Sequence, residues 1–256
     1  MVIKTVKLYK SLTILTSCLF IVLCSFLVGI TGAQTVYLGG TIRKLPIYSV
    51  DRNDNKIAIS FDCAYGADKT LNLLNTLDEY GVKCTFFCVE FWVNKFPDMV
   101  KEIVDRGHEI GTHSKTHPKM STLKVSEIES ELTSSINAIE NITGQKVELF
   151  RAPFGDYDND VITVAENLDL YTIQWDVDSL DWKDVTVNQI VNRIVNKTVS
   201  GSIILCHNNG ENTDKALPYV LARLKEKGFE FVKISELIYK QNYQINPFGK
   251  QVKTEK

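Results

Sequence analysis

Residues 201–206, GSIILC, form a short and almost wholly apolar segment that ends directly before His207. A strand in which polar and apolar residues do not alternate is typical of a sheet that is covered on both faces. Such sheets consist of parallel strands, and each parallel strand needs a crossover, usually a helix, to reach the next one. This segment therefore predicts an α/β fold.

The rest of the chain alternates between strand-like and helix-like segments, as this fold requires. Further strands are predicted at residues 56–61 (KIAISF), 82–89 (VKCTFFCV), 108–112, 147–151, 170–175 and 229–232. Apolar residues at helical spacing predict helices at residues 69–80, 97–105, 125–142, 159–167, 187–195 and 213–227, with a last short helix that ends at residue 239. These seven strand–helix units favour parallel strands with right-handed crossovers. A closed or nearly closed β/α barrel and an open doubly wound sheet both satisfy the pattern.

The N-terminus carries a separate signal. Three lysines precede an uncharged, mostly apolar run at residues 11–30, which is about long enough to cross a bilayer as a helix and is long for a signal-peptide core. Thr31-Gly32-Ala33 resembles a cleavage site that ends at Ala33. We expect residues 1–33 to be either a cleaved signal peptide or a retained membrane anchor. In both cases the remainder of the chain is exported, and the mature protein is extracytoplasmic.

The remaining sequence divides into a linker at residues 34–54, a globular domain at residues 55–240 and a polar, frayed tail at residues 241–256. The net charge of −2 gives no indication of nucleic-acid binding. Four cysteines lie outside the apolar N-terminal run: Cys63, Cys84, Cys88 and Cys206. Their apolar neighbours predict small, packed hydrophobic side chains rather than a disulfide framework.

Charged and metal-capable side chains stand at the ends of five predicted strands. These residues are Asp62, His113, His117, Arg151, Asp178, Asp181 and His207. Each alone has an ordinary structural role available, such as a helix cap, a salt bridge or a core histidine. Together they favour one shared site, because functional groups gather at the carboxyl ends of parallel strands. His113 and His117 are four residues apart, so on a helical turn both imidazoles would face one divalent ion.

The same residues lie in five ordered motifs that resemble those of the polysaccharide deacetylase family, carbohydrate esterase family 4, also called the NodB homology domain. The motifs are Ser60-Phe61-Asp62, His113-Ser114-Lys115-Thr116-His117, Arg151-Ala152-Pro153-Phe154-Gly155, Asp178-Ser179-Leu180-Asp181-Trp182 and Leu205-Cys206-His207. The resemblance covers residues 55–240. Within the family, the sequence resembles the sporulation-type peptidoglycan deacetylases most. It implies a distorted seven-unit (β/α) barrel.

The resemblance also implies a role for each motif residue. His113 and His117 would bind a divalent metal ion, most plausibly Zn²⁺. Asp62 would act as the general base, paired with Arg151. His207 would be the general acid, held protonated by Asp181. The backbone N–H of Phe154 would add an oxyanion donor. The residues expected to contact the substrate are Trp182, Leu205, Phe154, Pro153 and Tyr65.

One position departs from the family pattern. Most active relatives have two consecutive aspartates in the first motif, and the second is a metal ligand, whereas this chain has Asp62-Cys63. Three alternatives follow: Cys63 ligates as a thiolate, Asp68 reaches back from the same loop, or water completes a weaker two-histidine site. A second pattern, His108-Glu109-Ile110-Gly111-Thr112, begins like a zinc-protease helix but lacks the second histidine.

These observations predict a metal-dependent hydrolase that removes N-acetyl groups from a cell-envelope glycan, with peptidoglycan N-acetylglucosamine or N-acetylmuramic acid as the expected target. Two alternatives stay open at this point. One is a non-catalytic, glycan-binding member of the family, and the other is an O-acetyl esterase of the xylan type. The expected partners are the cell-wall glycan and, if the N-terminal segment is uncleaved, the membrane. A monomer is the default oligomeric state.

Overall fold

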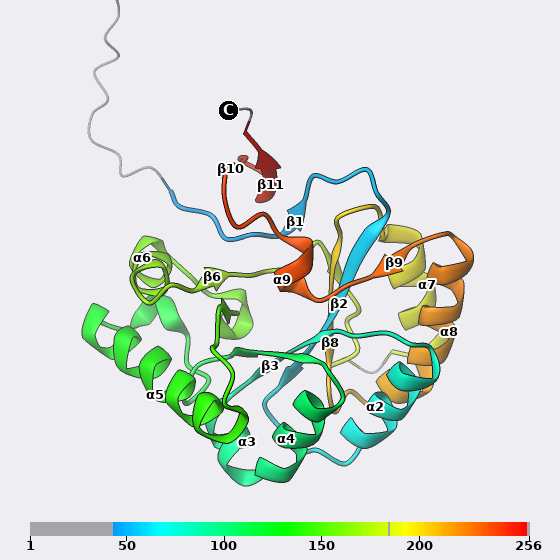
Figure 1. Ribbon diagram of the computed structural model, residues 1–256, viewed down its shortest axis with the longest axis horizontal. Coiled ribbons are helices and arrows are strands. Elements are labelled where there is room, and N and C mark those ends of the chain that lie inside the picture. The colour runs from blue at the N-terminus through cyan, green and yellow to red at the C-terminus, as the bar shows by residue number, and fades with distance from the viewer. Residues whose placement is uncertain (1–42, 184, 255–256) are drawn as a thin grey trace, which may run out of the picture. The chain divides into compact units, whose positions relative to one another are not determined.

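The computed structural model of the protein describes residues 43–183 and 185–254 (Figure 1). The predicted signal or anchor at residues 1–33 lies outside these residues. Within them, no helix combines the length and the apolar character that a membrane crossing requires.

A parallel sheet forms the centre of the fold, as the sequence predicts. Its strands are β2 (Lys56–Cys63), β3 (Thr85–Cys88), β4 (Glu109–Thr112), β5 (Leu149–Phe150), β6 (Tyr171–Thr172), β7 (Val177–Asp178), β8 (Ile203–His207) and β9 (Glu230–Phe231). The order is β6-β5-β4-β3-β2-β8-β7, and β9 pairs with the amino end of β2. Across the described residues no ladder joins β6 to β7, so the sheet is a parallel half-barrel and not a closed barrel.

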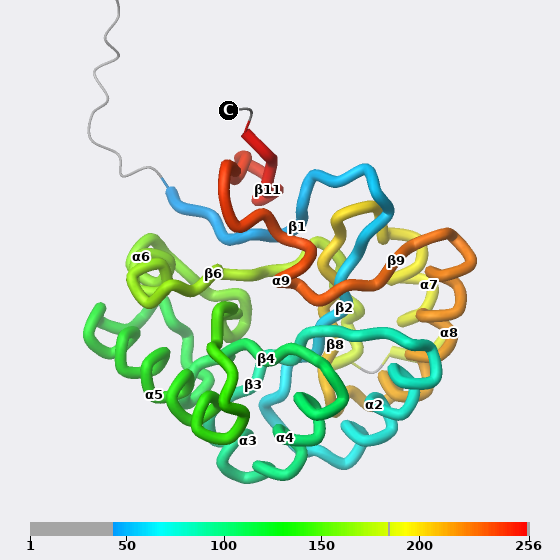
Figure 2. The backbone as a smooth tube through the Cα atoms, viewed as in Figure 1, coloured from blue at the N-terminus to red at the C-terminus, as the bar shows by residue number. Residues whose placement is uncertain are grey.

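Helices lie along the outer side of this sheet (Figure 2). They are α2 (Thr70–Glu79), α3 (Glu90–Lys95), α4 (Pro97–Asp105), α5 (Val125–Thr143), α6 (Asn159–Asn167), α7 (Val187–Lys197) and α8 (Thr213–Glu226). The short helix α9 (Ile234–Leu237) packs on the inner side instead, and the chain also forms the 3-10 turns η1 (Met120–Thr122) and η2 (Pro153–Gly155). Local signals account for their ends. Asp158 accepts a hydrogen bond from the N–H of Val161 at the start of α6, and Gly144 ends α5 with a φ of 66°.

Side chains along β2 point alternately to the two faces of the sheet, and this decides which of them face the inside of the half-barrel. Ile57, Ile59, Phe61 and Cys63 pack in the main hydrophobic core with helix residues such as Leu73 and Leu77. Ala58 packs in the smaller inner core, which also contains Phe87 and Ile203 from the neighbouring strands. Because successive strand residues point to opposite faces, Asp62 shares the inner face with Ala58, and Cys63 shares the outer face with Phe61.

The segment that we expected to be a linker belongs to the folded domain, so that expectation is wrong for residues 47–50. Ile47 is buried, forms a bridge to Ile173 next to β6, and its carbonyl accepts from the N–H of Gln174 at 2.7 Å. Ser49 forms a bridge to Ser202 next to β8. The segment therefore contacts both sides of the half-barrel, through residues next to β6 and β8.

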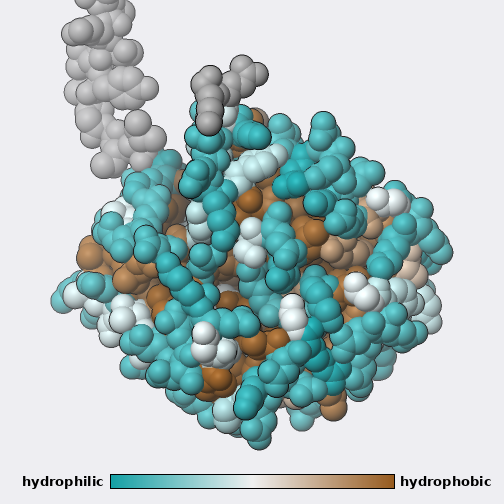
Figure 3. Space-filling view, in the orientation of Figure 1, coloured by the Kyte–Doolittle hydropathy of each residue, from teal (hydrophilic) through white to brown (hydrophobic). Residues whose placement is uncertain are grey.

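The expected frayed tail also forms regular structure. β1 (Ser49–Val50), β11 (Lys250–Lys253) and β10 (Tyr243–Ile245) make a separate three-stranded sheet near the C-terminus (Figure 1). The buried side chain of Gln251 holds the tail in place: its amide oxygen accepts from the N–H of Tyr239, and its amide nitrogen donates to the carbonyl of the same residue. A hydropathy pattern does not reveal a contact made by a polar side chain. On the face seen in Figure 3, apolar surface is interrupted by hydrophilic side chains.

Candidate active site

Asp62 and Arg151 form a buried ion pair at the carboxyl end of the sheet. Arg151 follows β5 directly, and its Nη1 donates to Oδ1 of Asp62 at 2.8 Å. The guanidinium lies 4.1 Å from the centre of the Phe87 ring. Burial acts to raise the pKa of Asp62, but the charge of Arg151, aided by His113 and His207, holds it below its usual 3.8. Asp62 is therefore ionised at neutral pH.

The imidazoles of His113 and His117 lie together beside this pair, with ring centres 5.0 Å apart. Nδ1 of His113 is 2.7 Å from the carbonyl oxygen of Arg151, to which it donates, so Nε2 keeps its lone pair. That Nε2 lies 3.5 Å from Oδ2 of Asp62. Burial lowers the pKa of both histidines, that of His117 to about 4, so both rings are neutral and able to ligate a metal.

The two histidines do not share a helical turn, which corrects the sequence argument for their proximity. Ser114 and His117 have φ values of 71° and 61°, in the left-handed region that residues with side chains rarely adopt. Hydrogen bonds from Lys115 and Thr116 to the Glu131 carboxylate of α5 hold the loop in this shape. Sequence spacing alone could not show that a tight loop, and not a helix, brings the rings together.

His207 ends β8 on the other side of Asp62. Its Nδ1 lies 2.7 Å from Oδ1 of Asp181, and its backbone N–H donates to Oδ2 of the same carboxylate at 2.8 Å. The hydroxyl of Thr213, the first residue of α8, donates to that Oδ2 at 2.6 Å. Burial acts to lower the pKa of His207, but the hydrogen bond and charge of Asp181, with Asp62 and Asp178, raise it above 6.5. This favours a protonated imidazole.

A cleft of about 280 Å³ opens between these groups. Asp62, Asp181 and His207 line its floor together with Tyr65 and Trp182, whose side chains are more than half exposed. Leu205 is buried on the same strand as His207, two residues earlier. A charged base and an acid with a raised pKa thus line one cleft, and the neutral imidazole pair lies beside the base, with Nε2 of His113 at 3.5 Å from it. This arrangement is suited to hydrolysis.

Phe154 and Pro153 lie in η2, next to the histidine pair. The Phe154 ring is 65% exposed and packs edge-on against His117, with centres 4.6 Å apart. Pro153 is buried. The N–H groups of Gly155 and Asp156 donate to the carbonyls of Ala152 and Pro153. Among the described residues, the N–H of Phe154 has no backbone carbonyl as a hydrogen-bond partner. That N–H remains available as the predicted oxyanion donor.

Comparison with known proteins agrees with this geometry. The family model described as Polysaccharide deacetylase matches residues 49–173. A peptidoglycan-N-acetylglucosamine deacetylase of Bacillus cereus is 33% identical over 196 residues, which span 75% of this chain and 92% of that protein. The chain belongs to the polysaccharide deacetylase family.

Two further members of the polysaccharide deacetylase family bear on its activity. The peptidoglycan-N-acetylglucosamine deacetylase PgdA of Listeria monocytogenes is 32% identical over 215 residues, or 84% of this chain, but the match spans only 44% of PgdA. The solved structure of BA3943, a family pseudoenzyme from Bacillus anthracis, is 35% identical with a TM-score of 0.73, covering 75% of this chain and 68% of that chain. A mutant of BA3943 with restored enzymatic activity matches at 36% identity.

The departure from the polysaccharide deacetylase pattern at Cys63 has a structural consequence. Cys63 pairs in register with Cys88 of β3, and burial, together with the neighbouring Cys88 thiol, raises its pKa well above 9.0. Its thiol lies in the outer core, on the face opposite to Asp62. Asp68 is exposed. Among residues 43–183 and 185–254, no three His, Cys, Asp or Glu side chains form a group ready to hold a metal ion.

Several site residues were not found from the sequence. Thr213 was predicted only as the start of a helix, and Gln174 only as part of a strand, yet the Gln174 carbonyl accepts from Nη2 of Arg151 at 3.3 Å. Glu131 was predicted only as part of the helix at residues 125–142. Only the position of Thr213 could have been inferred, since a helix that begins six residues after His207 starts at the same opening.

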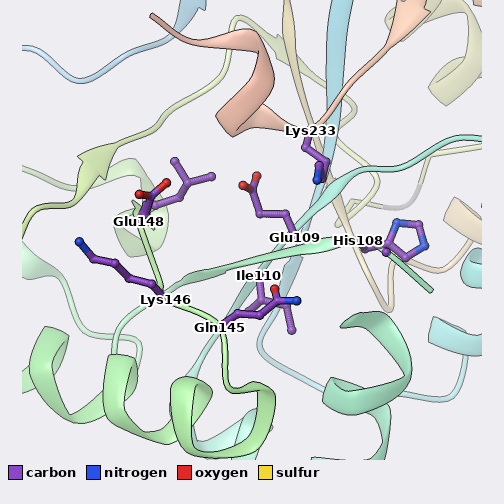
Figure 4. A pocket seen from close by; sticks show the side chains of 9 residues that line it. His108, Glu109, Ile110, Gln145, Lys146, Glu148 and Lys233 are labelled. Atoms are coloured by element: carbon purple, nitrogen blue, oxygen red, sulfur yellow. The ribbon is translucent and has the colours of Figure 1, made fainter. Parts of the chain in front are cut away.

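A second cavity, of about 220 Å³, lies at the amino ends of β4 and β5 and contains His108 (Figure 4). His108 is buried, and burial lowers its pKa to about 4. Its Nδ1 accepts from the N–H of Cys84 at 3.2 Å. Glu109 and Glu148, which line the same cavity, accept from Thr85 and Lys240. These contacts indicate a structural role, in agreement with rejecting the zinc-protease pattern.

Proposed function

We propose that the protein is a metal-dependent hydrolase that removes N-acetyl groups from a cell-envelope glycan, with peptidoglycan N-acetylglucosamine or N-acetylmuramic acid as the substrate. The observation that carries this proposal is the pairing of an ionised Asp62 with a His207 whose pKa is raised, on neighbouring strands of one cleft. Amide hydrolysis needs a base to activate water and an acid to protonate the departing amine, and these two groups are suited to those tasks.

The metal would be held by His113 and His117. Their neutral rings, and the hydrogen bond that fixes His113 through Nδ1, are the chemistry expected of imidazole ligands to Zn²⁺ or another divalent ion. When bound, such an ion supplies Lewis acidity toward the acetyl carbonyl oxygen and the attacking water. Water as the third ligand is the alternative that the geometry supports best, because Cys63 faces the outer core and Asp68 is exposed.

The chain's own residues would then carry the protons. Asp62 accepts a proton from the attacking water, while Arg151 keeps it ionised and fixes the carboxylate through Oδ1. His207 donates a proton to the amine nitrogen as the C–N bond breaks, and Asp181 holds its ring and keeps it charged. The N–H of Phe154 stabilises the oxyanion. Trp182, Tyr65 and Leu205 surround the sugar and its acetyl group, and the products are a free amino sugar and acetate.

Substrate and location are proposed from the relatives. PgdA and the Bacillus cereus protein are named as peptidoglycan-N-acetylglucosamine deacetylases, and a Bacillus subtilis relative, PdaC, as a peptidoglycan-N-acetylmuramic acid deacetylase. A peptidoglycan substrate requires an extracytoplasmic protein, either secreted or anchored through residues 1–33. The glycan is then the main partner, and a monomer is sufficient, because the cleft is built from one chain.

A second candidate function is favoured by one observation, the outward position of the Cys63 thiol. Without a carboxylate there, the protein would bind glycan but not hydrolyse it, as a non-catalytic member of the family. BA3943, described as a pseudoenzyme, shows that the fold exists without activity.

The deciding experiment measures acetate release from N-acetylated peptidoglycan by the full-length chain with added Zn²⁺, and repeats it with O-acetylated xylan. Release from peptidoglycan that is lost on replacing Asp62 or His207 supports the deacetylase. Faster release from xylan would identify an O-acetyl esterase instead. No release with any of several divalent ions, combined with glycan binding that neither a chelator nor His113→Ala alters, would identify the non-catalytic binder.

A further inference from the structure

Two exposed aromatic rings, those of Tyr65 and Phe91, lie side by side at the cleft. Six aromatic side chains are prominently exposed among the described residues, and four of them, Tyr65, Phe91, Phe154 and Trp182, belong to segments at the carboxyl end of the sheet. Tyr65 lines the cleft, with its ring 6.1 Å from that of His117. Phe91 lies on its other side, with ring centres 5.8 Å apart. Exposed apolar surface gathered at one place indicates a binding surface.

The two segments that carry these rings are fastened to each other. The indole N–H of Trp92 donates to the carbonyl of Gly66 at 2.7 Å, so the residues directly after Phe91 and Tyr65 are hydrogen-bonded. The side chain of Asn208 donates to the same carbonyl at 2.9 Å, and this ties the pair to the strand end that carries His207. The N–H of Glu90 donates to the carbonyl of Ser114 in the histidine loop. The rings are thus held in position relative to the catalytic groups.

The chemistry of the surface limits what it can bind. Within the described residues, Lys183 lies over the Trp182 ring at 4.7 Å, whereas no cation covers the ring of Tyr65 or Phe91. An uncharged ligand with one apolar face therefore fits best, and a pyranose ring has such a face in its axial C–H groups. The surface is continuous with the cleft, where a sugar residue of a polymer would bind.

We infer that Tyr65 and Phe91 form a subsite for the sugar residue next to the one that enters the cleft, on the same glycan strand. This inference rests on the proposed function only in taking a glycan as the ligand, and it applies equally to a non-catalytic binder. It gives the protein a preference for oligomers over the single sugar, because one sugar residue that fills the cleft does not reach Phe91.

The test is equilibrium binding of the monomer and the β-1,4-linked hexamer of N-acetylglucosamine to the full-length chain, with a chelator present so that no turnover occurs. We expect Phe91→Ala to weaken hexamer binding by about 10-fold, the size of one aromatic contact, and to change monomer binding by less than about twofold. Phe91→Trp keeps a flat ring and should retain hexamer binding. Phe248→Ala, which removes a ring that is 89% exposed on the hairpin between β10 and β11, is the matched control and should change neither.

Two results would overturn the inference: a wild-type protein that binds the hexamer no more tightly than the monomer, or a Phe91→Ala substitution that weakens binding of both equally or of neither. Acetate release is measured separately with added Zn²⁺. If no acetate is released but the length-dependent loss occurs, the subsite stands and the deacetylase proposal fails. If acetate is released and Phe91→Ala binds like wild type, the subsite fails and the deacetylase stands.

Discussion

Asp62 and His207 are direct partners in the register of the neighbouring parallel strands β2 and β8. Both side chains face the inside of the half-barrel, and the N–H of Asn208 donates to the carbonyl of Asp62 at 3.1 Å. The proposed base and acid are therefore placed by the strand ladder and not by flexible loops. Groups on strands are held more closely to a productive geometry than groups on loops, which suits a proton-transfer pair.

Replacing Asp62 with Asn should lower the rate of acetate release by about 10²- to 10⁴-fold, because amide oxygen cannot take the proton from water. It should also lower the free energy of unfolding by about 3 kcal/mol, because the fully buried Arg151 loses its counter-charge. Acetate release and urea unfolding measure the two effects. Asp98→Asn, which changes an exposed carboxylate on α4, is the control and should leave both unchanged. Full activity of Asp62→Asn would exclude Asp62 as the base.

Replacing Cys63 with Ala should leave the dissociation constant for Zn²⁺ within about twofold of wild type, because the thiol packs in the outer core beside Cys88 and not beside the imidazoles. The loss of packing should lower the free energy of unfolding by about 1 kcal/mol. Competition with a chromophoric chelator measures the affinity, and His117→Ala, which removes an imidazole, is the positive control for weakened binding. A tenfold or larger loss of Zn²⁺ affinity in Cys63→Ala would show that the thiolate ligates after all.

The pH dependence of the reaction should report His207. Its pKa is raised above 6.5 by Asp181, so activity should fall as the pH rises through this raised pKa and the ring loses its proton. The raised pKa also stabilises the fold: this contribution is complete below pH 6.5 and is lost as the pH rises through the pKa of the folded state. Asp181→Asn removes the hydrogen-bonded charge and should move the alkaline limb of activity down by about 1 pH unit.

The measurement for this prediction is the pH profile of kcat/KM for wild type and variants. Asp178→Asn is the matched control, since that carboxylate also faces His207 but contributes less to its pKa than Asp181 and Asp62 do. Asp178→Asn should move the alkaline limb of activity less than Asp181→Asn does. An alkaline limb that does not respond to Asp181→Asn, or that responds more to Asp178→Asn, would mean that another group is the acid.

Much of the fold could be predicted because apolar periodicity is a local property. The predicted helices at residues 97–105 and 159–167 match α4 and α6 at both ends. Segments 47–50 and 243–253 were missed because ladder partners and the buried amide of Gln251 hold them, not an apolar pattern of their own. Periodicity also left a nearly closed barrel and an open sheet as alternatives, because the absence of a ladder between β6 and β7 among the described residues is a non-local property.

The site shows the same division between local and non-local information. The ordered motifs predicted that Asp62, Arg151 and His207 would meet, because each stands at a strand end. They could not tell which face the residue after Asp62 takes, and that depends on how far β2 continues before the loop begins. In this structure β2 includes Cys63, so the alternation of the strand turns the thiol toward the helices.

Thr213 should prove to be a positioning residue, because its hydroxyl binds the Asp181 oxygen that also accepts the backbone N–H of His207. Thr213→Val keeps the volume but removes the donor, so Asp181 can rotate and the His207 ring is less well oriented. We expect kcat to fall about 10-fold with KM little changed, and the free energy of unfolding to fall by about 1 kcal/mol. Thr213→Ser keeps the hydroxyl and should restore kcat to within about twofold of wild type. Equal activity of the Val and Ser variants, measured by acetate release at saturating substrate, would show that the hydroxyl supports the fold alone.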